Sequence, residues 1–167
     1  GLFENRTVDL KAIPKKIFTP EHQQVALETA RKGIVLLKNR NLLPLSNTRE
    51  KKRILVTGPN ANNQTILGDW HAHQPDEKVT TIFEGIKELG SKKGYEVAYH
   101  DSGESIRKIN SKDIDAAVKK SKGFDYVVLV VGDNSMRYKW KDKTAGENMG
   151  RAALDLPGKQ LELVQSI

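Results

Sequence analysis

The sequence predicts an α/β fold: a three-layer α/β/α sandwich on a mainly parallel sheet. Helix-like segments alternate with three short apolar segments along the 167 residues, and this alternation favours a parallel sheet with helices on both faces. The aliphatic run at 127–131 lacks polar alternation, which is typical of a central strand buried on both sides. Two loops, 58–79 and 132–153, are far longer than ordinary connectors of about 2–6 residues.

The first helix is predicted to begin at the Thr-Pro-Glu sequence at 19–21. Threonine is a good N-cap, proline suits the first helical position, and glutamate suits the first turn. Apolar residues then recur at helical spacing, so we expect this helix to end at about Asn39. Residues 1–18 lack such a pattern and are expected to form a linker or arm.

The strands are predicted where apolar runs lie between glycine, proline or polar residues: 53–57, 95–99 and 125–131. Between the first two, Thr81 and Glu84 have the spacing of a capping box, which predicts a helix to about residue 90 or 91. Two more helices are expected: 112–121, capped by Asn110 or Ser111, and a terminal helix from about 157.

Composition argues against several classes of protein. No apolar run approaches the roughly 18–20 residues that span a bilayer, so no membrane partner is expected. The net charge of +7 would suit nucleic acid, but the lysines are spread along the chain and aromatic residues are only 6 %, too few for stacking on bases. The absence of cysteine excludes disulfides and thiol catalysis.

Nucleotide binding is the rival suggested by the strand–helix alternation. The first strand ends at Gly58-Pro59-Asn60, without a G-x-G-x-x-G motif or a P-loop lysine. Pro59 would also remove an amide that a phosphate cradle needs. A nucleotide-binding domain is therefore the less favoured alternative, and no cofactor is expected.

The first long loop holds a candidate sugar contact. The indole of Trp70 can stack on the apolar face of a pyranose, and the neighbouring Asp69 can accept hydrogen bonds from hydroxyls. Spacing alone favours the alternative that Trp70 covers the edge of the sheet. His71 and His73 could pair on a metal, but no third ligand lies nearby in the sequence, so no metal site is expected.

The second long loop holds candidate acid/base carboxylates. Glu147 and Asp133 lie on either side of Tyr138 and Trp140, and a loop carboxyl flanked by aromatics can serve as a general acid if partial burial raises its pKa. The alternative is an ordinary surface carboxylate, which is the usual outcome for a lone glutamate.

Taken in order, the motifs resemble family 3 glycoside hydrolases, the β-glucosidase and β-xylosidase family. The resemblance covers nearly the whole chain. It rests on GLFEN at 1–5, ARKGIVLLKN at 30–39, LLPL at 42–45, GPNA at 58–61, GDW at 68–70, EGI at 84–86, VVG at 130–132 and LDLPGKQ at 154–160.

The resemblance implies a fragment of a larger retaining β-glycosidase that acts on β-linked oligosaccharides or glycosides. Such enzymes have an N-terminal (β/α)8-type barrel that carries an Asp nucleophile, and then a sandwich domain that usually supplies the acid/base Glu. By resemblance, 1–18 is the arm from that barrel and 19–167 is a partial, truncated sandwich, inactive alone. For the parent we expect the periplasm or secretion, with a cytoplasmic location as the alternative.

The resemblance also assigns roles to individual residues. Glu147 matches the acid/base position, with Asp133 as the fallback, and Trp70 flanks a sugar subsite with Asp69 as the weaker contact. Many relatives have Glu where this chain has Asp133, and often Asp where it has Gly150. A non-catalytic sugar-binding or scaffold domain is the alternative function.

Overall fold

The computed structural model describes residues 1–45, 50–103 and 105–167. By its contacts the chain divides into two compact units, Gly1–Ser46 and Asn47–Ile167. The predicted division into an arm, 1–18, and a sandwich domain, 19–167, concerns the parent protein and stays a prediction.

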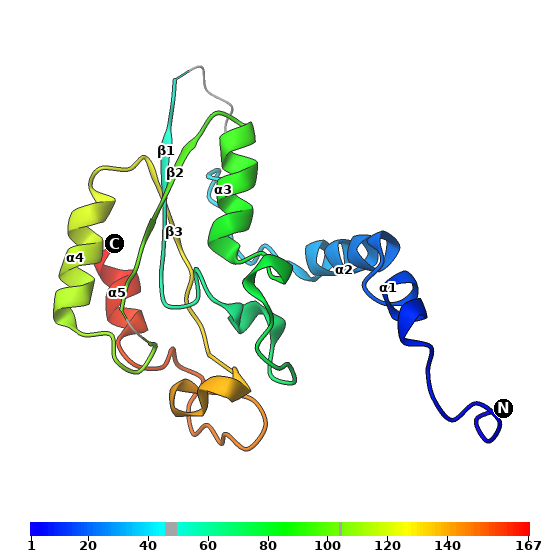
Figure 1. The fold of residues 1–167 in the computed structure, drawn as a ribbon. Helices are drawn as coiled ribbons and strands as arrows, with labels where there is room; N and C mark the ends of the chain where they lie inside the picture. The colour runs from blue at the N-terminus through cyan, green and yellow to red at the C-terminus, as the bar shows by residue number, and fades with distance from the viewer. Residues whose placement is uncertain (46–49, 104) are drawn as a thin grey trace. The chain divides into compact units, whose positions relative to one another are not determined.

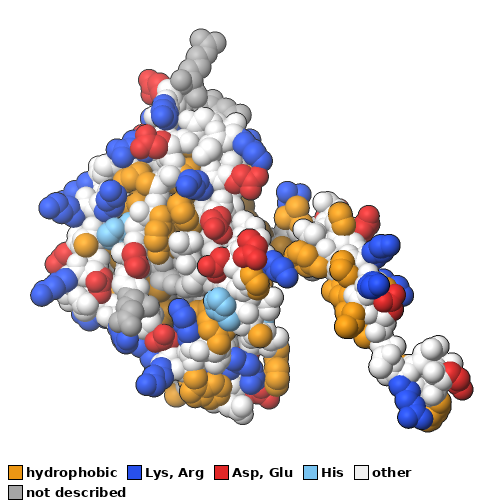
Figure 2. Space-filling view, in the orientation of Figure 1, with side chains coloured by type: hydrophobic (Ala, Val, Ile, Leu, Met, Phe, Trp, Pro, Cys, Tyr) orange, Lys and Arg blue, Asp and Glu red, His pale blue; other side chains and the backbone are white. Residues whose placement is uncertain are grey.

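The first unit consists of short helical elements: η1 (Leu10–Ala12), α1 (Ile13–Lys16) and α2 (Pro20–Gly33). As predicted, Thr19 caps α2, and its Oγ1 accepts a hydrogen bond from the His22 amide. The predicted end at Asn39 is wrong, because the backbone becomes extended at Ile34. Ile34 and Val35 are β-branched, which disfavours a helix and outweighs the apolar periodicity. None of the residues of α2 is buried, and Figure 2 shows apolar side chains along this unit.

The second unit contains a three-stranded parallel sheet: β1 (Arg53–Thr57), β2 (Glu96–His100) and β3 (Tyr126–Leu129). The strand order is β2-β1-β3, and Leu55 of β1 lies opposite Ala98 and Val127. The parallel sheet confirms the predicted α/β class.

The position of β3 corrects one prediction. The aliphatic run at 127–131 was expected to be the central strand, but β1 is central and β3 lies at one edge of the described sheet. Residues 54–57 of β1 are buried, whereas β3 is only half-buried and ends at Leu129. An apolar run reports a tendency to be buried, and it does not specify the order of strands in a sheet.

Helices cover both faces of the sheet, which gives the three predicted layers. Helix α3 (Ile82–Lys92) lies on one face, and α4 (Ser111–Ser121) and α5 (Gln160–Ser166) lie on the other (Figure 1). The capping box of α3 is confirmed, with the Glu84 amide 3.2 Å from Thr81 Oγ1 and the Thr81 amide 2.8 Å from Glu84 Oε2. The last helix begins at Gln160, three residues later than predicted, after a turn.

The core of this unit lies between the sheet and the helices. Leu163 of α5 and Ile114 and Ala117 of α4 are buried together, and Leu129 of β3 packs against them. Within the described residues, no helix is long and apolar enough to cross a bilayer. Short 3-10 helices lie in the loops: η2 (Gln64–Leu67), η3 (Asp76–Lys78) and η4 (Arg137–Asp142).

Candidate active-site loops

The two long loops leave neighbouring strands at the same edge of the sheet. One follows β1 and the other follows β3, and parallel neighbours place their carboxyl ends together. Asn60 joins the loops, because its Nδ2 donates to the Asp133 carbonyl at 3.1 Å and its amide donates to Val130 O at 3.4 Å. The structure therefore brings together the segments that the sequence singled out.

Asp69 lies at the centre of the contact between the loops. Its Oδ1 is 2.7 Å from Lys143 Nζ and 3.1 Å from Arg137 Nε, and its Oδ2 accepts a 2.6 Å hydrogen bond from the Glu147 amide. Its side chain is only 15 % exposed. Both carboxylate oxygens are thus already engaged by protein donors, and a direct contact of Asp69 with sugar stays a prediction.

Trp70 extends from the first loop into solvent. It is 76 % exposed, and the Arg137 guanidinium carbon lies 3.7 Å from its ring centroid, within the range of a cation–π contact. An exposed indole backed by a cation fits a stacking surface better than a cover for the sheet.

Glu147 lies on a tight turn of the second loop. Gly146 and Asn148 on either side have positive φ, +95° and +62°, a conformation in which glycine and asparagine are enriched. The Met149 amide closes the turn on Gly146 O at 3.1 Å. The Glu147 side chain is 45 % exposed and forms an ion pair with Arg137. A half-exposed carboxylate on a fixed turn has the access that a proton donor needs.

Asp133, the fallback acid/base candidate, is more tightly engaged. Its Oδ1 accepts a hydrogen bond from Thr144 Oγ1 at 2.9 Å and forms an ion pair with Arg151. Arg151 also donates to the backbone carbonyls of Ala153 and Asp155. This carboxylate therefore ties together parts of the second loop, a structural use that the sequence did not suggest.

The last residue of the LDLPGKQ motif, Gln160, has a structural role. Its side chain is fully buried, and its Nε2 donates to Gly132 O and Pro157 O, both at 2.9 Å. The Gly132 amide in turn donates to Gln160 Oε1 at 2.8 Å. The motif thus anchors the start of the second loop to α5, and it supports the candidate site without belonging to it.

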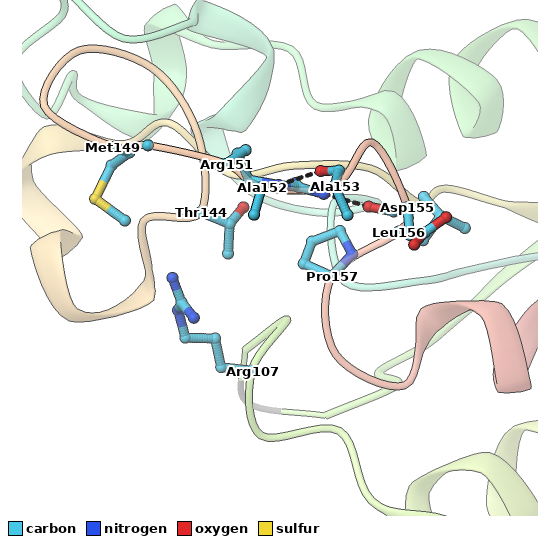
Figure 3. Close-up of a pocket in the computed structure, with 10 residues that line it drawn as sticks. Arg107, Thr144, Met149, Arg151, Ala152, Ala153, Asp155, Leu156 and Pro157 are labelled. Carbon is cyan, nitrogen blue, oxygen red and sulfur yellow. Dashed lines mark hydrogen bonds between the residues drawn. The ribbon is translucent and has the colours of Figure 1, made fainter.

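A pocket of about 330 Å³ lies beside the second loop. Figure 3 shows that Arg107, Thr144, Met149, Arg151 and Pro157 line it. Arg107 Nη2 donates to Lys143 O at 2.9 Å. Glu147 does not line this pocket, so the pocket is a neighbour of the candidate site and not its centre.

Lys143 and Arg137 were missed by the sequence reasoning. Lys143 is fully buried, although five residues of the 137–143 segment are lysine, arginine or aspartate and such residues are almost always exposed. Nothing in the local sequence distinguishes this lysine from Lys139 or Lys141. The buried ammonium of Lys143 is paired with the carboxylate of Asp69, 74 positions away, and also donates to the Glu147 carbonyl at 2.9 Å.

The two loop histidines contact an aromatic ring. The rings of His71 and His73 lie edge-on to Tyr138, with centroids 5.6 and 4.9 Å away. Burial raises the pKa of the Tyr138 phenol, and the negative charge of Asp76 adds to this. Within the described residues, no three His, Asp or Glu side chains gather as metal ligands would.

Curated proteins align with nearly the whole of this chain. The chain is 36 % identical over 156 residues to probable beta-D-xylosidase 7 of Arabidopsis thaliana and 34 % identical over 176 residues to a beta-xylosidase of Formosa agariphila. These alignments cover 92 % and 100 % of this chain but only 18 % and 22 % of the relatives. This chain therefore spans about a fifth of the length of the curated relatives it matches.

The fold also matches a solved structure. The crystal structure of a beta-glucosidase from Listeria innocua in complex with glucose aligns with a TM-score of 0.73 and 27 % identity, over 99 % of this chain and 21 % of that one. The model of the glycosyl hydrolase family 3 C-terminal domain matches residues 34–167. The chain belongs to the glycosyl hydrolase family 3 C-terminal domain family.

Proposed function

We propose that this chain forms part of a retaining, exo-acting β-glycosidase and supplies its acid/base loop and part of its sugar subsite. The observation that carries the proposal is the meeting of the Trp70 and Glu147 loops at the carboxyl end of the sheet. The matched relatives are called beta-xylosidases and beta-glucosidases, so the substrate class is a β-xyloside or a β-glucoside.

In this proposal two carboxyl groups share the chemistry. A nucleophile on an N-terminal barrel domain of the same parent chain attacks the anomeric carbon, while Glu147 protonates the departing oxygen. Glu147 then removes a proton from the water that releases the sugar. Retaining enzymes place these carboxyls about 5–5.5 Å apart, which a half-exposed glutamate on a projecting turn can satisfy from across a domain interface.

The proposal is tested on the full-length parent protein. We expect it to hydrolyse nitrophenyl β-xyloside or nitrophenyl β-glucoside, and proton NMR of the first-formed sugar should show the β-anomer. The chain 1–167 alone should hydrolyse neither, because it lacks the nucleophile. An α-anomer as first product, or sugar binding without hydrolysis by the parent, would contradict the proposal, and the second result would favour a binding or scaffold domain.

Removal of the Trp70 indole should weaken substrate binding. A sugar stacked on this ring is expected to gain about 0.5–1.5 kcal/mol, so Trp70→Ala should raise KM of the parent about 2- to 10-fold with little change in kcat. Trp70→Phe keeps an aromatic face and should retain most of the affinity. An unchanged KM in the alanine variant would remove Trp70 from the subsite.

A further inference from the structure

The amide and the carbonyl of Glu147 are both held by one ion pair, that of Asp69 with the buried Lys143. The Glu147 amide donates to Asp69 Oδ2 at 2.6 Å, and its carbonyl accepts from Lys143 Nζ at 2.9 Å. Lys143 Nζ lies 2.7 Å from Asp69 Oδ1, so Asp69, Lys143 and the Glu147 backbone form a closed ring of three contacts. The candidate acid/base residue is thereby held by a carboxylate from the other loop.

The surroundings fit this arrangement closely. Lys143 is fully buried and the Asp69 side chain is 15 % exposed, and a buried charge is tolerated only when it is paired and hydrogen-bonded. A Cβ on Gly146 would lie 2.5 Å from Asp69 Oδ2, so only glycine lets the carboxylate approach the Glu147 amide. Asp69, Lys143 and Gly146 thus all contribute to the contact that holds the Glu147 backbone.

We propose that Asp69 and Lys143 are positioning residues that fix the turn bearing Glu147, so that its carboxyl can reach the departing oxygen. This inference rests on the proposed function. It gives Asp69 a different task from the direct sugar contact suggested by the sequence. Loss of the contact should act on proton donation, since a displacement of about 1 Å at a reacting group can lower a rate about 100-fold.

The test is Asp69→Asn in the full-length parent enzyme, assayed with two glycosides. A phenyl leaving group needs protonation, whereas a dinitrophenyl leaving group departs without it. We expect kcat/KM to fall about 10- to 100-fold for the phenyl glycoside and less than about 3-fold for the dinitrophenyl glycoside. Lys143→Met, which removes the second arm of the ring, should show the same selective loss.

Asp125 offers a matched control at the opposite end of the sheet. Its Oδ2 accepts the Arg53 amide at 2.7 Å and its Oδ1 lies 3.2 Å from Lys52 Nζ, and these contacts hold the pKa of Asp125 below its usual value, the Arg53 amide most of all. Asp125→Asn thus removes an equivalent carboxylate and should leave the ratio of the two kcat/KM values unchanged.

The remaining outcomes separate this inference from the proposed function. An equal loss on both glycosides, or a rise in KM alone, would overturn the positioning role, because misfolding and lost sugar contacts affect both substrates alike. If Glu147→Ala shows the selective loss and Asp69→Asn does not, the inference fails and the proposed function stands. If Glu147→Ala shows no selective loss, the proposed acid/base role of Glu147 is wrong, and the positioning role of Asp69 and Lys143 is wrong with it.

Discussion

Replacing Glu147 with alanine in the full-length parent enzyme is expected to lower kcat/KM for a phenyl glycoside by about 100- to 10,000-fold, the usual contribution of a general acid. For a dinitrophenyl glycoside kcat/KM should change little, because that leaving group needs no proton. The later step should still suffer, since water loses its general base, and kcat should fall while the glycosyl-enzyme accumulates.

Azide gives the signature that distinguishes this role from a loss of folding. It is an anionic nucleophile that needs no base, and the cavity left by the side chain gives it access to the glycosyl-enzyme. Azide should therefore raise kcat of the alanine variant on the dinitrophenyl glycoside and yield a β-glycosyl azide. Wild-type enzyme should show no such acceleration, because its water is already activated.

Two further variants show whether Glu147 is the right carboxylate. Glu162 on α5 is 48 % exposed and ion-paired with Lys159 at 3.0 Å. Glu162→Ala is therefore a matched control that should leave kcat/KM for both glycosides unchanged. Asp133→Ala, which leaves a comparable cavity, tests the fallback candidate. If azide accelerates the Asp133 variant and not the Glu147 variant, the two assignments must be exchanged.

The helices and strands that could be predicted from the sequence are those that residues close together in the chain determine. The box of Thr81 and Glu84 lies within four positions, so its residue types alone specify the start of α3. Strand 53–57 is likewise bounded by its own polar and glycine neighbours. The end of α2 was wrong because apolar spacing continued beyond Gly33, where β-branched residues favour an extended chain.

The parts that did not follow depend on contacts between distant segments. The edge position of β3 is a matter of strand order, which composition does not encode. The pairing of Lys143 with Asp69 joins positions 74 residues apart, and neither residue type signals burial. The role of Glu147 came from resemblance, and it stays a prediction that the experiments above decide.

A large loss of stability is expected from Gly58→Ala, at the point where β1 passes into the first long loop. Gly58 has φ of +107°, and a Cβ built there would lie 2.2 Å from the Val130 carbonyl oxygen and 2.7 Å from its nitrogen. These are backbone atoms next to β3, and the Val130 amide donates a hydrogen bond to Thr57 O at 2.8 Å. They cannot move aside without breaking the pairing that brings the two loops together.

Two costs should add at this position. An L-residue at positive φ costs about 1–2 kcal/mol, and overpacking against fixed atoms costs about 1–3 kcal/mol more, so Gly58→Ala should lower the free energy of unfolding by about 2–5 kcal/mol. Urea unfolding of the chain 1–167, followed by circular dichroism, measures this difference.

Gly94 separates the two costs. It also has positive φ, +85°, but no atom lies within 4 Å of a Cβ built there, so Gly94→Ala should cost only the conformational part, about 1–2 kcal/mol. If both variants lose the same stability, the close approach of Gly58 to Val130 is not what requires glycine. A larger loss for Gly58→Ala would show that the close approach to Val130 requires glycine at position 58. This approach lies where the two candidate loops leave the sheet.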